Sequence, residues 1–168
     1  MEPEIQQKLE RELQDHRHEG NISQRISTYD LNDVVNISLN VISQTVGTAA
    51  GNYDAYFMVP QVSPTATIER IDFSGTDALA TSDTNYITWT ITNLGQDGAG
   101  TNVILGTENT KVTGGSAIAA NTKRTFTLTT EPKDLNVVIG DRIRIRAAVT
   151  GTLANTVTFP VYLIQLTQ

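Results

Sequence analysis

The stretch from Ala66 to Thr92 limits the fold of this chain more than any other part of the sequence. Each of its two ends alternates polar residues with β-branched or aromatic residues, and the second of these runs is centred on Trp89. Such period-two alternation predicts two strands with one buried face each, so we expect Trp89 in the core. Residues 75–85 between them are rich in Gly, Thr, Ser, Asp and Asn, which favour turns. A connection of this length can pass from one sheet of a sandwich to the other.

Similar runs follow one another along most of the chain, with turn-forming residues between them and no helical pattern. Strands at such intervals predict an all-β fold, a jelly-roll or immunoglobulin-like antiparallel sandwich, preceded by a short N-terminal helix. A hydrophobic content of 39% is sufficient for a core of its own. The expected strands are residues 34–46, 53–59, 66–73, 86–92, 102–105, 124–130, 142–149 and 156–166.

Residues 2–18 predict the N-terminal helix, because they are strong helix formers with Pro3 near the first helical position. Ile5, Leu9 and Leu13 recur every four residues and form one narrow apolar stripe. A helix that buries so little apolar surface is not stable alone in water. We therefore expect it to pack against copies of itself or against another protein. The alternative interpretation is a solvated tail that frays, as chain termini often do.

We divide the chain into three segments. Residues 1–33 form a helical attachment segment, in which Gly20 ends the helix. Residues 34–51 contain a strand and a small-residue hinge, and residues 52–168 form the β-sandwich domain.

The charge and the cysteine content exclude several classes of partner and chemistry. A formal net charge of −6 at pH 7 argues against nucleic acid or an anionic membrane as the main partner. The chain contains no cysteine, which excludes disulfides, thiolate catalysis and cysteine-ligated metals. It has no long apolar run, and its amino terminus lacks the apolar centre of a secretion signal. We therefore expect a soluble protein that is made in a cytosol.

Four motifs of the predicted sandwich occur in a recognisable combination. They are YFMVP at residues 56–60, ATIERIDF at 66–73, the Ala-Leu to Asp-Thr-Asn-Tyr segment at 78–86 with the TWTITNLG that follows it, and the Gly140-Asp141 turn before RIRIRAAVTGT. Together they resemble small β-sandwich proteins of tailed-bacteriophage virions, over roughly residues 53–160. The resemblance implies a head-decoration, head-fibre or tail-associated structural subunit. Such subunits are often trimeric, and a small N-terminal segment attaches a projecting β domain to the virion.

The segment at residues 15–31 also resembles the His-rich attachment segments that precede such domains. The resemblance implies a protein that is made in the host cytoplasm and located in the virion. Its expected partners are phage capsid or tail proteins and further copies of itself, in a homotrimer. The residues to which we assign attachment or oligomerisation are Ile5, Leu9, Leu13, Ile22, Ile26, Tyr29 and Leu31.

His16 and His18 have the one metal-like spacing in the sequence. Two imidazoles in one chain do not complete a metal site, which usually needs four ligands. On a threefold axis the pair would occur three times, and six imidazoles suit a first-row transition metal, an arrangement that resembles the His-x-His sites of trimeric phage fibres. Against this, residues two apart on a helix point in nearly opposite directions. The alternative is a polar role at the C-terminal end of the helix.

Arg142, Arg144 and Arg146 alternate with apolar residues and are expected on one face of a strand. This row of guanidinium groups is a candidate binding face for a carboxylate-bearing glycan or an acidic partner. The alternative interpretation is a solvated outer face, whose charges blunt edge pairing or meet acidic side chains on the next strand.

A different function also fits these patterns, a receptor-binding or glycan-binding module of a tail fibre that recognises bacterial surface glycan. The loop tips at residues 95–100 and 114–115 would then form the site. Asp77, Asp83 and Asp97 lie in loops and are interpreted as turn formers rather than calcium ligands.

No catalytic signature accompanies these features. Both histidines lie in the N-terminal segment, and neither a Gly-x-Ser-x-Gly motif nor a catalytic paired-carboxylate motif occurs. We expect no enzyme and no cofactor. A pair of carboxylates far apart in the sequence, as in glycosidases, is the alternative left open.

Overall fold

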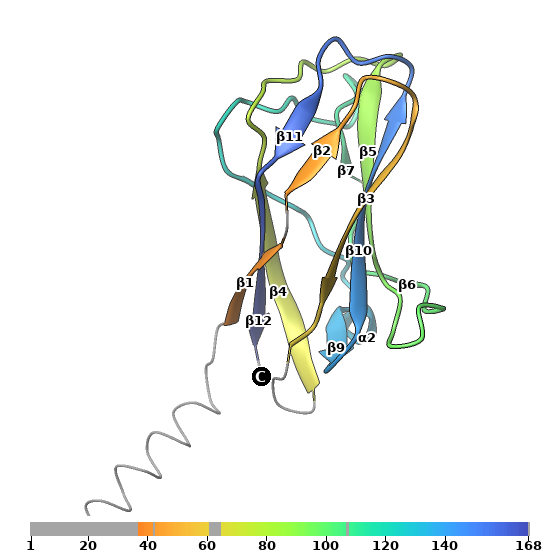
Figure 1. The fold of residues 1–168 in the computed structure, drawn as a ribbon, viewed down its shortest axis with the longest axis vertical. Helices are drawn as coiled ribbons and strands as arrows, with labels where there is room; N and C mark the ends of the chain where they lie inside the picture. The colour runs from red at the N-terminus through yellow and green to blue at the C-terminus, as the bar shows by residue number, and fades with distance from the viewer. Residues whose placement is uncertain (1–36, 42, 61–64, 107, 168) are drawn as a thin grey trace, which may run out of the picture. The chain divides into compact units, whose positions relative to one another are not determined.

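The computed structural model describes residues 37–41, 43–60, 65–106 and 108–167 (Figure 1). The predicted N-terminal helix and the whole attachment segment, residues 1–33, lie outside these residues. Within the described residues, no helix is long and apolar enough to cross a membrane. The described helix α2 has four residues.

Almost all regular structure in the described residues is β-strand. The elements are β1 Ile37–Val41, β2 Gln44–Val46, β3 Gly51–Met58, β4 Thr65–Ser74, β5 Tyr86–Asn93, β6 Asn102–Val103, β7 Glu108–Asn109, β8 Arg124–Thr125, α2 Pro132–Leu135, β9 Asn136–Val138, β10 Arg142–Thr150, β11 Val157–Phe159 and β12 Val161–Thr167.

The strands pair in a nested order that identifies the topology. β1 pairs with β12, β2 with β11, β3 with β10 and β4 with β9, while β5 pairs with β6 and β7, all antiparallel. A long antiparallel ribbon of this kind, rolled up so that its two arms fall into two sheets, is a jelly roll. One sheet has the order β1-β12-β4-β8 with β9 also on β4, and the other has the order β3-β10-β5-β6 with β7 also on β5. The prediction of an all-β antiparallel sandwich is confirmed, in its jelly-roll form.

The apolar side chains of the alternating strands fill the core. β10 reads exposed and buried in turn, with every second residue from Ile143 to Val149 facing inward. β5 does the same around Trp89, which is 1% exposed, as expected. The connection from β4 to β5 passes from one sheet to the other, also as expected. Each large apolar side chain that is fully buried in this way contributes roughly 1.5–3 kcal/mol.

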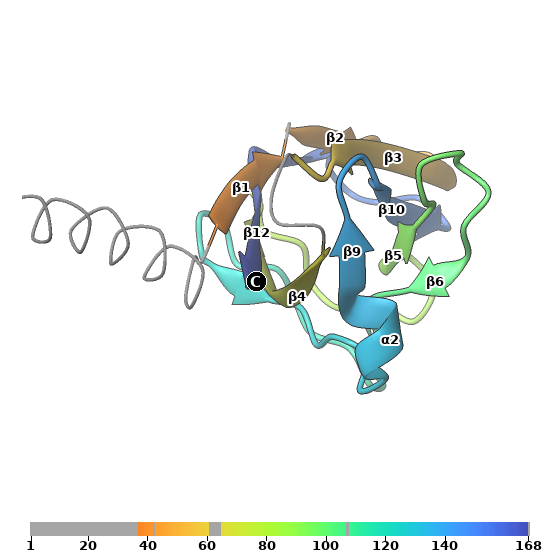
Figure 2. The same ribbon diagram turned by 90° about the horizontal axis from the view of Figure 1, so that it is seen from below.

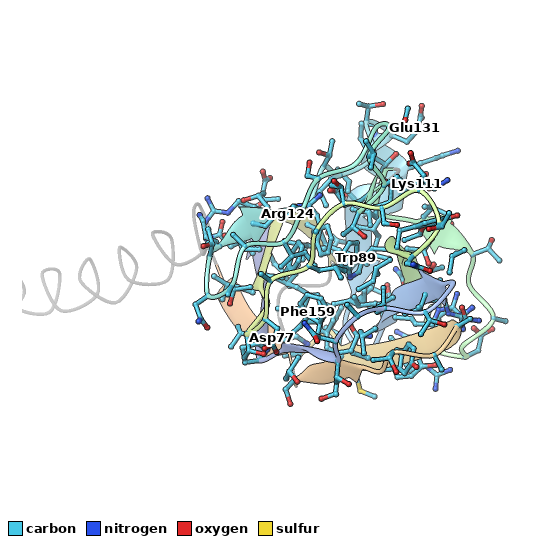
Figure 3. The ribbon with its side chains drawn as sticks, turned by 90° about the horizontal axis from the view of Figure 1, so that it is seen from above. Asp77, Trp89, Lys111, Arg124, Glu131 and Phe159 are labelled. Atoms are coloured by element: carbon cyan, nitrogen blue, oxygen red, sulfur yellow. The ribbon has the colours of Figure 1, made fainter. Side chains whose placement is uncertain are left out.

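An aromatic cluster occupies the middle of the sandwich (Figure 3). The ring of Phe73 on β4 stacks on Phe126 with centroids 4.3 Å apart and lies 5.4 Å from the Trp89 ring. Trp89 meets Phe159 edge to face at 5.8 Å. Offset and edge-to-face arrangements of this kind are the favourable ones for aromatic rings. The cluster therefore joins the two sheets at one point of the core.

The sandwich begins earlier in the chain than the predicted boundary at residue 52. β1 and β2 pair with the last two strands, and Val46 is completely buried in the core. The segment at residues 34–51 therefore contributes strands to the sandwich from Ile37 onward and is no separate hinge. Its predicted single strand is two strands, and the last strand is likewise divided at Pro160, which cannot donate to a β-ladder. The ribbon can therefore bend between the two sheets (Figure 1).

The buried amide of Gln44 closes one side of the sandwich, where the ribbon bends. Its Nε2 donates to the carbonyl oxygens of Tyr53 on β3 (2.8 Å) and Ile145 on β10 (3.2 Å), and its Oε1 accepts from the Tyr162 hydroxyl on β12. Burial raises the pKa of Tyr162 above its ordinary value of about 10. One neutral side chain thus ties strands of both sheets together.

The opposite side is closed by charge and by backbone. Leu105, which follows β6, forms an antiparallel bridge with Leu128, which follows β8. Beside this bridge Arg124 of the β4 sheet pairs with Glu108 of the β5 sheet. The Arg124 guanidinium also lies about 6 Å from the rings of Phe73 and Trp89, close enough for a cation–π contact. Both sides of the core are therefore covered, and seen along the long axis in Figure 2 the two sheets enclose it.

Candidate binding face on the outer β10 sheet

The outer surface of the sheet that contains β10 carries the predicted arginine row. Arg142, Arg144 and Arg146 lie on its outer face, while the residues between them are buried. β10 is a central strand, paired with β3 on one side and β5 on the other. The arginines therefore do not protect an edge of the sheet, and their neighbours come from both adjoining strands.

Arg146 is neutralised by its neighbour on β3. Its Nε and Nη2 each donate to Asp54 at 2.7 Å, which is a bidentate ion pair. The hydrogen bond from Arg146 lowers the pKa of the Asp54 carboxyl, and the same bond raises the pKa of Arg146. Residues 54 and 146 are 92 positions apart, so no sequence motif joins them. This arginine meets an acidic side chain on the next strand, as the alternative interpretation proposed.

Arg142 and Arg144 differ from Arg146 in their partners. No carboxylate of the described residues forms an ion pair with either of them. The Nε of Arg144 is buried and lacks a hydrogen-bond partner within the described residues. Of the three arginines, these two are therefore the ones without a carboxylate partner among the described residues, and they are the candidates for an anionic ligand.

An aromatic ring and two other apolar side chains surround this pair. Tyr56 is the Cα partner of Arg144 on β3 and is 45% exposed, and its neighbour on the same face, Met58, is 66% exposed. On the other side, Val103 of β6 is 48% exposed and pairs with Thr92, the β5 partner of Arg144. We name the set Tyr56, Met58, Val103, Arg142 and Arg144 the Tyr-Arg face.

Two contacts hold parts of the Tyr-Arg face in place. The Tyr56 hydroxyl donates to Asp54 at 3.3 Å, and the Arg142 guanidinium lies 5.9 Å from the centre of the Tyr56 ring. Gly98, in the loop after β5, packs so closely on the Arg142 guanidinium that any side chain there would collide with it. Gly98 has a φ of +83°, which glycine adopts without strain.

The loop tips that were expected to form one site lie far apart. Residues 95–100 follow the last residues of β5, whereas the turn at 114–115 lies beside β7, near the first residues of β5. The strand between them separates the tips by roughly 20 Å. A single site built from both tips is therefore excluded.

Three further sequence features fall in different places. The carboxylates of Asp83 and Asp97 accept hydrogen bonds from backbone N–H groups in turns, and that of Asp77 accepts a hydrogen bond from the Thr76 hydroxyl. No group of three potential metal-ligating side chains occurs within the described residues. His16, His18 and all seven attachment residues lie outside the described ranges.

Two shallow grooves lie away from the Tyr-Arg face. One, of about 440 Å³, is at the end of the sandwich where residues 78–85 meet residues 152–155, and neutral side chains line it. The other, of about 270 Å³, lies over Asp72, whose carboxylate already contacts Arg70, Lys123 and Thr125. Neither groove contains an unpaired charge that indicates a ligand.

Sequence reasoning identified the arginines but missed their neighbours. Tyr56 was expected only as part of a strand, because aromatic residues occur on both faces of residues 53–58 and the sequence alone does not show which face is the outer one. The register of β3 on β10 places Tyr56 beside Arg144 and Asp54 beside Arg146. The available signal was the alternation in YDAYFM, residues 53–58, in which the even-numbered residues face outward.

No protein-family model matches the chain, and no curated protein matches it. Among solved structures, a xylan-binding module, CBM15, is similar over 80% of this chain and 99% of that one, with 13% identity and a TM-score of 0.43. Structures of the infectious bursal disease virus Gx and Gt strains are similar over 80% of this chain, each with 10% identity and TM-scores of 0.42 and 0.34. The chain spans 32% and 30% of those two chains. Likenesses of this size assign neither a ligand nor a partner.

Proposed function

We propose that the protein is a non-enzymatic structural component of a tailed-bacteriophage virion, either a capsid decoration or head fibre or a tail-associated subunit. In this proposal it is made in the host cytoplasm, assembles as a homotrimer and binds capsid or tail proteins through residues 1–33. Its task is to hold a β-sandwich on the particle, and it uses neither cofactor nor membrane nor nucleic acid.

The pairing of β1 with β12 is the observation that supports an anchored, projecting sandwich. Ile37 lies opposite Leu166, so the sandwich begins and ends at the same end. The N-terminal segment is joined to that end. The groove between residues 78–85 and 152–155 lies at the opposite end of the sandwich, beyond β11. In our proposal the end that is joined to the N-terminal segment serves for attachment, and the faces and the other end make contacts outward.

Attachment in this proposal depends on weak contacts repeated in several chains. The stripe of Ile5, Leu9 and Leu13 is too small for a durable contact in one chain. Three copies that are linked in one assembly raise the effective concentration of the second and third contacts. The dissociation of the whole assembly is therefore much slower than that of one segment.

The test compares the full chain with a variant that starts at residue 36, which keeps β1 and β2 in the sandwich. We expect the full chain to sediment as a trimer and to bind particles of the phage that encodes it, and the shortened chain to stay folded but lose binding. Leu9→Asp in the full chain should weaken particle binding, whereas Gln7→Asp on the polar side should not. Particle binding by the shortened chain that equals that of the full chain would contradict the proposal.

A second candidate function is a receptor-binding or glycan-binding module of a tail fibre. The observation that favours it is the Tyr-Arg face, where an exposed ring lies beside two guanidinium groups that have no carboxylate partner in the part of the chain that the structure describes. This function places the recognition site on the sheet and not at the loop tips.

A further inference from the structure

We propose that the Tyr-Arg face binds a carboxylate-bearing glycan, with the carboxylate on Arg144 and Arg142 and a sugar ring on Tyr56. The inference rests on the second candidate function and names its ligand class and its residues. It also excludes Arg146, which the sequence placed in the same row.

The choice of an anion follows from the contrast along β10. Arg146 has a bidentate partner in Asp54, so its charge is already satisfied. Arg144, two residues before it on the same face, has a buried Nε with no partner among the described residues. A guanidinium group presents several N–H donors in a plane that matches the two oxygens of a carboxylate. The local excess of two positive charges occurs in a chain with a net charge of −6, so it is a local feature and not a general one.

The choice of a sugar follows from the side chains beside the arginines. The Tyr56 ring is fixed by its hydroxyl on Asp54 and keeps 45% of its surface exposed. A flat aromatic ring with one polar end suits the apolar face of a sugar ring. Thr88 and Thr90 on β5 continue the outer face with hydroxyl groups, which can exchange hydrogen bonds with sugar hydroxyls.

The surroundings favour a glycan over an acidic protein surface. The exposed apolar residues of the face, Met58 and Val103, lie on opposite sides of the arginines. They do not form the contiguous apolar centre that protein interfaces have. An extended polymer that crosses the strands at Arg144 would meet the Tyr56 ring on one side and Val103 on the other, and Thr90 lies one register position away, beside Arg146.

The test measures binding of oligogalacturonate and of its neutral methyl ester to the full chain by calorimetry. The two probes share their sugar rings and differ in charge. We expect saturable binding of the acid form, at least about tenfold weaker binding of the ester, and weakening of the acid form as salt is raised. Polysialate is a second carboxylate-bearing probe with a different sugar ring. It detects binding in case the face accepts a carboxylate only on a sugar of that geometry.

Matched variants assign the binding to the face. Arg144→Gln should lower the affinity for the acid form about tenfold to a hundredfold, and Tyr56→Ala should lower it for both probes. The control is Lys123→Gln, which removes one positive charge beside β8 in the other sheet, and it should bind within about twofold of the unmodified chain. A thermal midpoint for each variant confirms that it is folded.

Three outcomes overturn the inference. Equal binding of acid and ester, unaffected by Arg144→Gln, keeps a glycan function and rejects the anionic class. Absence of saturable binding to both acidic probes rejects the inference, and absence of binding to the neutral ester and to bacterial surface polysaccharide as well rejects the second candidate function; the virion proposal keeps its own test. Loss of particle binding in Arg144→Gln without glycan binding assigns the face to an acidic protein partner instead.

Discussion

The two sides of the sandwich are closed by opposite kinds of polar chemistry. On the side where the ribbon bends, Gln44 is 4% exposed and neutral, and it bonds to Tyr53, Ile145 and Tyr162. On the other side Arg124 and Glu108 are charged, with side chains 18% and 13% exposed. A charge loses much of its hydration free energy when it is fully buried, whereas an amide with all its partners loses little. The difference shows that the exposure of each side to water determines whether a charged or only a neutral polar side chain is tolerated there.

The largest expected effect is that of a charge on the neutral side. Gln44→Glu keeps the size of the side chain but places a carboxylate beside two carbonyl oxygens. At pH 7 we expect a loss of about 3 kcal/mol or more of unfolding free energy. Burial raises the pKa of such a carboxyl, so the loss should shrink as the pH falls toward 4. Urea unfolding at both pH values measures it, with Gln44→Met as the uncharged control. Equal losses for the two variants at pH 7 would remove the contrast between the two sides.

The next effect comes from separating the ion pair. Arg124→Met leaves the Glu108 carboxylate near the aromatic cluster without its partner, and we expect a loss of about 2–3 kcal/mol. The double variant Arg124→Met with Glu108→Leu should recover most of that loss, because no unpaired charge remains. Denaturant unfolding of both variants gives the coupling energy. A double variant that is no more stable than the single one would show that the guanidinium stabilises chiefly through its contacts with Phe73 and Trp89.

A smaller effect concerns the Tyr162 hydroxyl, which donates a hydrogen bond to Gln44. Tyr162→Phe removes that donor and should lower stability by about 1–2 kcal/mol at pH 7. The raised pKa of Tyr162 in the folded state means that its contribution is complete below pH 10 and is lost as the pH rises above 10, where the unfolded chain ionises. The unmodified protein should therefore lose more stability than Tyr162→Phe between pH 9 and about pH 11. Parallel losses in the two proteins would argue against a buried, neutral phenol.

The smallest effect belongs to the partly exposed pair of Asp54 and Arg146, beside the Tyr-Arg face. Asp54→Asn breaks the pair with Arg146 and should cost less than about 1 kcal/mol at pH 7. Because the pKa of Asp54 is lowered in the folded state, its contribution is present above about pH 4 and disappears as the pH falls below that value. Thermal midpoints at pH 7 and pH 3 compare the variant with the unmodified chain. A larger cost than that of Arg124→Met would reverse the order of the two ion pairs.

The long strands of the sandwich were predictable because their alternation extends over many residues. β4, β5 and β10 each bury one face, and their expected limits agree with the structure within one residue at each end. β7 and β9 have two and three residues, too few for a period to be recognised, and the expected strand at 124–130 is reduced to the two residues of β8. The helix α2 occurs where only turn-forming residues were expected between strands. The residues of the candidate site depend on the register between strands far apart in the chain. Alternation alone placed Arg142, Arg144 and Arg146 on one face, but only the pairing with β3 separates the neutralised arginine from the other two.

The nested strand order has a consequence for how the protein is made. The first described strand pairs with the last, so β1 cannot pair until the residues around Leu166 have been synthesised. Pairings this far apart in sequence make folding slow, since the loop must be closed before the contacts reward it. During synthesis at about 5–20 residues per second, several seconds pass in which β1 and β3 have been made but their partners have not. Folding must therefore follow synthesis, and in that interval the unpaired strands are open to aggregation or to chaperones.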